Sequence, residues 1–169
     1  MDKNKTVSPH EHTGQVWLVS ACLLGFQCRY DGKTASEPAR KRLKILSNEK
    51  LIPICPEESG GLGTPRLPAV IHGTDGKSVL DGTGRIINEE GQDVTDAFKK
   101  GAFTALQAAQ AHGATHACLK ARSPSCGVGE THTADGLVKG DGVTAALLRR
   151  EGLHVFNDED RENLSQEIK

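Results

Sequence analysis

Short apolar segments alternate along this chain with segments of helical spacing, and this alternation constrains the fold more than any other feature. Apolar runs of strand length occupy residues 15–21, 51–54, 114–121 and 153–156. Helical patterns occupy residues 36–48, 93–112, 143–150 and 158–168. Strands that alternate with helices favour a parallel sheet with right-handed crossovers and helices on its faces. The sequence therefore predicts an α/β fold in which helices flank a small, mostly parallel sheet.

The length of the chain fits a single domain. Its 169 residues fall within the range of roughly 100 to 200 residues that is usual for one domain. Residues 1–14 are polar and are predicted to form a flexible leader, and residues 15–169 are predicted to form one α/β domain. Within this domain, Ser59 to Asp93 is rich in Gly, Pro, Asp and Thr, which indicates loops and a hairpin in a lid-like insertion.

The charge balance and the apolar runs exclude two classes of partner. The formal net charge is -1 and the pI is about 6.6, so the chain lacks the basic character of proteins that grip long DNA or RNA. We therefore expect a small-molecule ligand. The N-terminal residues lack the apolar core of a secretory signal, and the run Val16 to Phe26 is too short to span a bilayer. The sequence predicts a cytoplasmic protein without a membrane partner.

Five cysteines are the main candidates for chemistry. In a reducing cytoplasm, an odd number of cysteines indicates metal ligands, nucleophiles or core residues rather than disulfides. Cys22, Cys55 and Cys126 each fall at or just after the carboxyl end of a predicted strand, where parallel sheets bind ligands. We expect these three residues to converge at one edge of the sheet. Cys118 lies inside a predicted strand and is interpreted as a core residue.

Each of the three strand-end cysteines lies in a polar, turn-rich motif. The motifs are SACLLGFQCRYDG (residues 20–32), ICPEESGGLGTPR (54–66) and LKARSPSCGVG (119–129). The third motif combines basic side chains, hydroxyls and a thiol in a loop whose backbone amides suit a bound anion. None of the motifs contains the paired C-x2-C of zinc ribbons or the compact cysteine run of ferredoxins, so spacing alone does not specify a metal. The motifs predict a polar cleft lined by thiols.

The three motifs, together with GDGVTAALL at residues 140–148, resemble in order the signatures of the thiouracil desulfidase family, a bacterial family long known only as a domain of unknown function. The resemblance extends over most of the chain, from about residue 19 to residue 156. It implies an enzyme that removes sulfur from a thiolated pyrimidine such as 2-thiouracil. The products would be uracil and hydrogen sulfide, with no net redox change.

The same resemblance implies a [4Fe–4S] cluster held by three cysteines, which are Cys22, Cys55 and Cys126. The fourth iron would be free to bind the sulfur of the substrate, because a thiocarbonyl sulfur is a soft ligand that such iron prefers to water or carboxylate. Cys28 is a weaker fourth candidate, because family members often carry an apolar residue at its position.

A proton-accepting group is needed near the carbon that water attacks, and Glu57 is the carboxylate best placed by the sequence. Lys120 is expected to stabilise negative charge on the ring, in the manner of an oxyanion donor. Ser123 and Ser125 are expected to orient the pyrimidine. The remaining expected contacts to the substrate are Asp31, Arg122 and Gly127.

Two other functions are compatible with these residues. The thiols can hold zinc or an iron–sulfur cluster in a sensor or structural protein without turnover, or a thiol can act as nucleophile or redox group without metal. A carboxylate beside a ligand cysteine and the polar residues of the third motif favour an enzyme. The sequence does not distinguish a free base from a nucleoside or nucleotide, sulfur at ring position 2 from position 4, or one oligomeric state from another.

Overall fold

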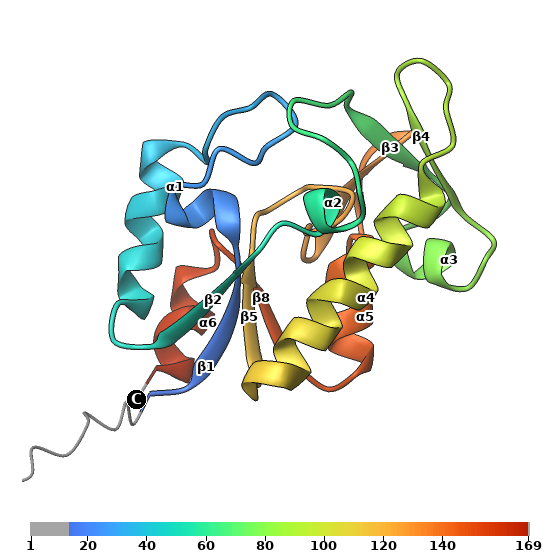
Figure 1. The fold of residues 1–169 in the computed structure, drawn as a ribbon. Coiled ribbons are helices and arrows are strands. Elements are labelled where there is room, and N and C mark those ends of the chain that lie inside the picture. Colours follow the sequence, from blue (N-terminus) through green and yellow to red (C-terminus); the bar gives the residue numbers. More distant parts are fainter. Residues whose placement is uncertain (1–13, 169) are drawn as a thin grey trace, which may run out of the picture.

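The computed structural model describes residues 14–168, and Figure 1 shows their fold. The predicted leader, residues 1–14, lies outside the described residues except for Gly14. Four strands form a parallel sheet in the order β2-β1-β5-β8. They are β1 (Val16–Ser20), β2 (Lys50–Ile54), β5 (His116–Leu119) and β8 (His154–Asn157). These strands lie within or next to the four predicted apolar runs, and the sheet confirms the predicted α/β fold.

Helices cover both faces of the parallel sheet, because successive side chains of each strand point to opposite faces. Leu18 belongs to one core and its neighbours Trp17 and Val19 belong to the other. The first core is covered by α4 (Thr95–His112) and α5 (Val143–Arg150), which lie side by side in Figure 1. The second core is covered by α1 (Glu37–Arg42), the 3-10 helix η2 (Leu43–Leu46) and α6 (Arg161–Glu167). Cys118 is fully buried in this second core, as predicted.

The four predicted helices are present, with differences in their bounds. Gly113 ends α4 in the left-handed conformation, with φ 67°, as expected of a C-terminal glycine cap. The predicted helix over residues 36–48 is instead divided into α1, capped by the Ser36 side chain, and the tighter η2. The last helix begins at Arg161 rather than at Asp158, whose carboxylate is buried. No helix within residues 14–168 is long and apolar enough to cross a bilayer.

A second four-stranded sheet has the order β4-β3-β6-β7 and was not expected as a sheet. Its strands are β3 (Ala69–His72), β4 (Arg85–Asn88), β6 (Glu130–Thr133) and β7 (Gly136–Lys139). The β3–β4 pair is the predicted hairpin, but it pairs through β3 with β6 and so is part of a sheet rather than a separate lid. The same stretch also contains the short helix α3 (Gly76–Leu80), which the sequence did not indicate.

The short helix α2 (Pro56–Ser59) packs directly against the backbone of α4. A Cβ atom at Gly101 of α4 would collide with the carbonyl oxygen of Pro56, so the absence of a side chain permits this contact. Cys55 is the N-cap residue of α2, and Glu57 is its second residue. The glycine in the middle of α4 therefore permits the close packing of the short helix that carries two candidate site residues.

We expect Gly101→Ala to destabilise the protein, although alanine in place of glycine normally stabilises a helix by roughly 0.5–1 kcal/mol. The added methyl group overpacks the contact between α2 and α4, which typically costs about 1–3 kcal/mol. Urea unfolding measures the change, with Gln107→Ala on the exposed side of the same helix as the matched control. An increase in the free energy of unfolding of Gly101→Ala would contradict this description of the contact.

Candidate functional site

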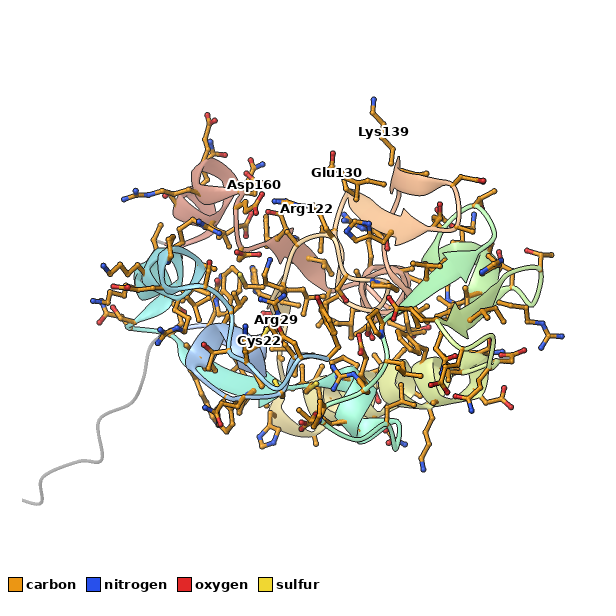
Figure 2. All side chains as sticks on the ribbon, turned by 90° about the horizontal axis from the view of Figure 1, so that it is seen from above. Cys22, Arg29, Arg122, Glu130, Lys139 and Asp160 are labelled. Carbon is orange, nitrogen blue, oxygen red and sulfur yellow. The ribbon has the colours of Figure 1, made fainter. Side chains whose placement is uncertain are left out.

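A cavity of about 380 Å³ lies at the carboxyl ends of β1, β2 and β5. Figure 2 looks onto this end of the molecule, where Cys22, Arg29 and Arg122 lie near the centre of the view. Its volume falls in the range of about 300–1,000 Å³ that is typical of small-molecule sites. Four of the five cysteines line it, namely Cys22, Cys28, Cys55 and Cys126. The cavity is therefore the thiol-lined cleft that the sequence predicts.

The strand ends position the thiols. Cys22 lies in the 3-10 helix η1 (Ala21–Leu24), which directly follows β1, and Cys55 directly follows β2. Cys126 lies in the loop after β5, where its backbone N–H donates to the Ser123 hydroxyl at 2.9 Å. Because parallel strands end at one edge of the sheet, all three thiols reach the same cavity. The prediction that the cysteine motifs follow the carboxyl ends of strands is confirmed.

Cys28 is the fourth thiol at this cavity. Its carbonyl oxygen accepts a hydrogen bond from the Cys55 thiol at 3.5 Å. A hydrogen bond with Cys22 raises the pKa of the Cys28 thiol to about 11, and burial raises the pKa of the Cys126 thiol to about 12. A hydrogen bond with Cys28 is the larger cause, and burial the smaller cause, of a raised pKa of the Cys55 thiol. A metal binds these sulfur atoms as thiolates, so it must displace their protons. Its positive charge then compensates the negative charge of the thiolates.

The thiol of Cys28 contacts those of Cys22 and Cys55, and Cys126 lies near Cys55 at the same cavity. Within residues 14–168, no three His, Cys, Asp or Glu side chains form a set for a single metal ion. An iron–sulfur cluster takes cysteine ligands on separate irons, so its ligands do not need to meet at one atom. The chemistry and the distribution of the donors fit such a cluster.

One carboxylate of α2 reaches the cavity. The Glu57 side chain is only 17% exposed and its Oε2 atom lies 2.5 Å from Nε of Arg66, whose side chain is 10% exposed. Glu58 is exposed and accepts a hydrogen bond from the Thr64 hydroxyl at 2.5 Å. The two adjacent carboxylates therefore differ in environment, and Glu57 is the one that lines the cavity.

The loop after β5 places two of the predicted polar residues at the cavity and one behind it. Lys120 and Ser123 line the cavity. The Ser123 hydroxyl also accepts the backbone N–H of Ser125 at 3.1 Å, which stabilises the turn that carries Cys126. Ser125 itself is fully buried, and its hydroxyl pairs with that of Thr144 in α5 at 2.8 Å. Ser125 is thus placed to support the loop from behind the cavity.

Arg122, Gly127 and Asp31 have contacts that the sequence did not predict. Arg122 lines the cavity, but its guanidinium forms a bidentate ion pair with Glu159 at 2.5–3.0 Å. Gly127 is outside the cavity lining and is packed against backbone carbonyls, with its N–H donating to the carbonyl of Ser123 at 2.8 Å. Asp31 is also outside the lining, and its carboxylate accepts the N–H of Lys33 at 3.1 Å. Their predicted contacts to substrate stay predictions.

The sequence predicts no role for three residues at or next to the site, which are Ser20, Asp158 and Arg66. The Ser20 hydroxyl lines the cavity and accepts the N–H of Lys120 at 2.9 Å. Asp158 is buried and accepts the N–H of Ala121 at 2.8 Å and a guanidinium N–H of Arg42 at 2.8 Å, so it fixes the turn after β5. Arg66 binds Glu57. Two of these residues could have been found from their place in the chain, because Ser20 is the last residue of β1 and Asp158 directly follows β8.

The fold and the cavity define an α/β protein with a candidate metal site, in which thiols and one carboxylate surround a cavity at the ends of parallel strands. The chain belongs to the 2-thiouracil desulfurase family, which it matches over residues 17–160. This match confirms the resemblance found in the sequence.

Two similar proteins match almost their full length. The uncharacterized protein YbbK of Bacillus subtilis (strain 168) is 42% identical over 144 residues, which are 83% of this chain and 94% of YbbK. The solved structure of the [4Fe–4S]-dependent thiouracil desulfidase TudS has a TM-score of 0.74 and 36% sequence identity, and the match covers 90% of this chain and 96% of that one.

Proposed function

We propose that this protein hydrolyses the carbon–sulfur bond of a thiolated pyrimidine such as 2-thiouracil. One water molecule and 2-thiouracil yield uracil and hydrogen sulfide, so that oxygen replaces sulfur on the ring and no electrons are gained or lost. The observation that carries this proposal is the convergence of the strand-end thiols and the carboxylate of Glu57 on one cavity. Membership of the 2-thiouracil desulfurase family supports it.

Cys22, Cys55 and Cys126 are the residues proposed to hold a [4Fe–4S] cluster. The description of TudS as [4Fe–4S]-dependent supports this assignment, as does the thiol lining of the cavity. When bound through three cysteines, such a cluster supplies an open iron as a soft Lewis acid for the sulfur of the substrate. Cys28 is a neighbouring thiol in this proposal, and its loop contacts Cys55 through the Cys28 carbonyl.

Glu57 is proposed to accept the proton of the water molecule that attacks the thiolated carbon, and then to return it to the departing sulfur. Its partly buried position beside the thiols supports this role. Lys120 is proposed to stabilise the negative charge that develops on the ring, and Ser123 to orient the ring. Ser125 contributes by holding the Cys126 loop through Thr144.

The wall of the cavity also suits a flat ring. Leu67, Val70 and Phe98 line the cavity on the side of α4 and the second sheet. Apolar side chains of this kind bind the faces of a base, while a small number of polar groups fix its orientation. A thiolated pyrimidine would thus meet apolar contacts on its faces and polar groups at its edge.

Turnover in water enriched in ¹⁸O tests the hydrolytic reaction. The anaerobic holoenzyme is expected to release uracil and sulfide in equal amounts without an electron donor, and the new oxygen of uracil should carry the label. Unreacted 2-thiouracil and free uracil incubated without enzyme control for spontaneous exchange. A requirement for a reductant, or unlabelled uracil, would contradict the proposed reaction.

A further inference from the structure

We infer that Arg66 is a positioning residue that holds the carboxylate of Glu57 toward the thiol-lined cavity and links it to the loop of Cys28. This inference rests on the proposed function, in which Glu57 transfers the proton. The sequence offered Arg66 only as the last residue of the second cysteine motif, without a role.

The guanidinium of Arg66 joins two of the cysteine motifs. Its Nε atom donates to Oε2 of Glu57 at 2.5 Å, and one terminal nitrogen donates to the carbonyl of Cys28 at 2.9 Å. The other terminal nitrogen donates to the Thr64 hydroxyl at 3.0 Å. The planar guanidinium carries donors in a fixed geometry, so these three contacts set the position of the carboxylate relative to the Cys28 loop.

Burial makes the Glu57–Arg66 pair dependent on both partners. The side chains are 17% and 10% exposed, and loss of one partner from a buried ion pair leaves the other charge without compensation. Burial is the largest influence and lowers the pKa of Arg66, but the attraction and hydrogen bond of Glu57, together with nearby Cys55 and Glu58, outweigh it and the net pKa is raised. The guanidinium is therefore a permanent positive partner for the carboxylate.

The Glu57 side chain borders a second open space as well as the thiol-lined cavity. A second cavity of about 210 Å³ adjoins the first, and both Glu57 and Arg66 line it as well. A carboxylate released from Arg66 would have space to rotate away from the thiols. The hydrogen bond from Arg66 therefore holds the carboxylate beside the first cavity although open space adjoins it.

The loop contact has a backbone component that does not need the Arg66 side chain. The backbone N–H of Arg66 donates to the carbonyl of Tyr30 at 2.8 Å. Substitution of the side chain leaves this bond available, so the segment should stay near the first cysteine loop. We therefore expect variants of Arg66 to retain the metal centre, whereas the Glu57 carboxylate is no longer held in its position.

The test is a double-mutant cycle on the anaerobically reconstituted holoenzyme, with Arg66→Met and Glu57→Gln singly and together. Arg66→Met alone is expected to lower kcat about 100-fold, as is typical when a reacting group is misplaced by about 1 Å. KM should change by less than about threefold, because the lost interaction acts in the transition state. Iron content should match that of the unsubstituted protein. In the Glu57→Gln background, Arg66→Met should lower kcat by less than about threefold further.

Arg66→Lys provides the conservative comparison and also serves if Arg66→Met fails to fold. A single ammonium lacks the planar fork and cannot reproduce the contacts to both Glu57 and Cys28, so an intermediate loss of about tenfold is expected. Equal losses with and without Glu57 would overturn the inference, as would loss of iron in both Arg66 variants. If the unsubstituted holoenzyme releases no uracil, the proposed function fails instead. The two failures are therefore distinguishable.

Discussion

Replacement of Cys126 by alanine is expected to remove the cluster and the turnover together. Cys126 is buried in the cavity and is one of the three strand-end thiols proposed as ligands. A metal acting as a Lewis acid supplies several kcal/mol, and each 1.4 kcal/mol or so is worth a factor of ten, so a loss of at least about 1,000-fold in kcat is expected. Iron analysis and uracil release measure the two effects on one sample.

Cys118→Ala is the matched control for this substitution. Cys118 is also buried and lies in β5, the strand that precedes the Cys126 loop. It belongs to the second core and is outside the cavity lining. This control should keep the iron content and the rate of the unsubstituted protein, with only a modest loss of stability. A normal cluster and a normal rate after Cys126→Ala would refute the assignment of the ligands.

Glu57→Gln is expected to leave the cluster intact and to lower kcat by about 100-fold to 10,000-fold, which is the range for loss of a general acid–base group. Glutamine has the size of glutamate and can still accept a hydrogen bond from Arg66, but it cannot take a proton from water. Iron content, visible absorbance and steady-state rates of the reconstituted variant measure the outcome.

The neighbouring carboxylate gives the control for this substitution. Glu58 belongs to the same turn of α2, is exposed, and bonds to Thr64 rather than lining the cavity. Glu58→Gln should therefore retain a rate within about twofold of the unsubstituted protein, as is usual for surface substitutions away from the site. Equal losses for the two variants would show that charge near α2, and not a proton acceptor at Glu57, matters for turnover.

The parallel sheet was predictable because its two central strands, β1 and β5, are buried on both faces. Trp17, Leu18 and Val19 are all fully buried, and such a continuous apolar run stands out in the sequence. The second sheet did not stand out, because β6 alternates buried Thr131 and Thr133 with exposed residues and contains no aliphatic side chain. Its pairing with β3 joins segments distant in sequence, which local patterns do not reveal.

The candidate site was predictable where it depends on strand ends and not where it depends on side-chain pairing. Parallel topology alone brings Cys22, Cys55 and Cys126 to one edge. The ion pair of Arg122 with Glu159 spans 37 residues, and no spacing rule links the two positions. The pair of Glu57 with Arg66 depends on the path of the loop between them, so the sequence placed both residues in one motif without indicating their contact.

The most direct test of the proposed function is anaerobic reconstitution of the purified protein with iron and sulfide, followed by measurement of bound iron and of uracil released from 2-thiouracil in the same sample. The proposed function predicts about four irons per chain in a [4Fe–4S] cluster, and turnover that rises in proportion to cluster content. A stable cluster without turnover would contradict the enzyme and favour a sensor or structural role. Full turnover in protein treated with a chelator under reducing conditions would contradict the cluster.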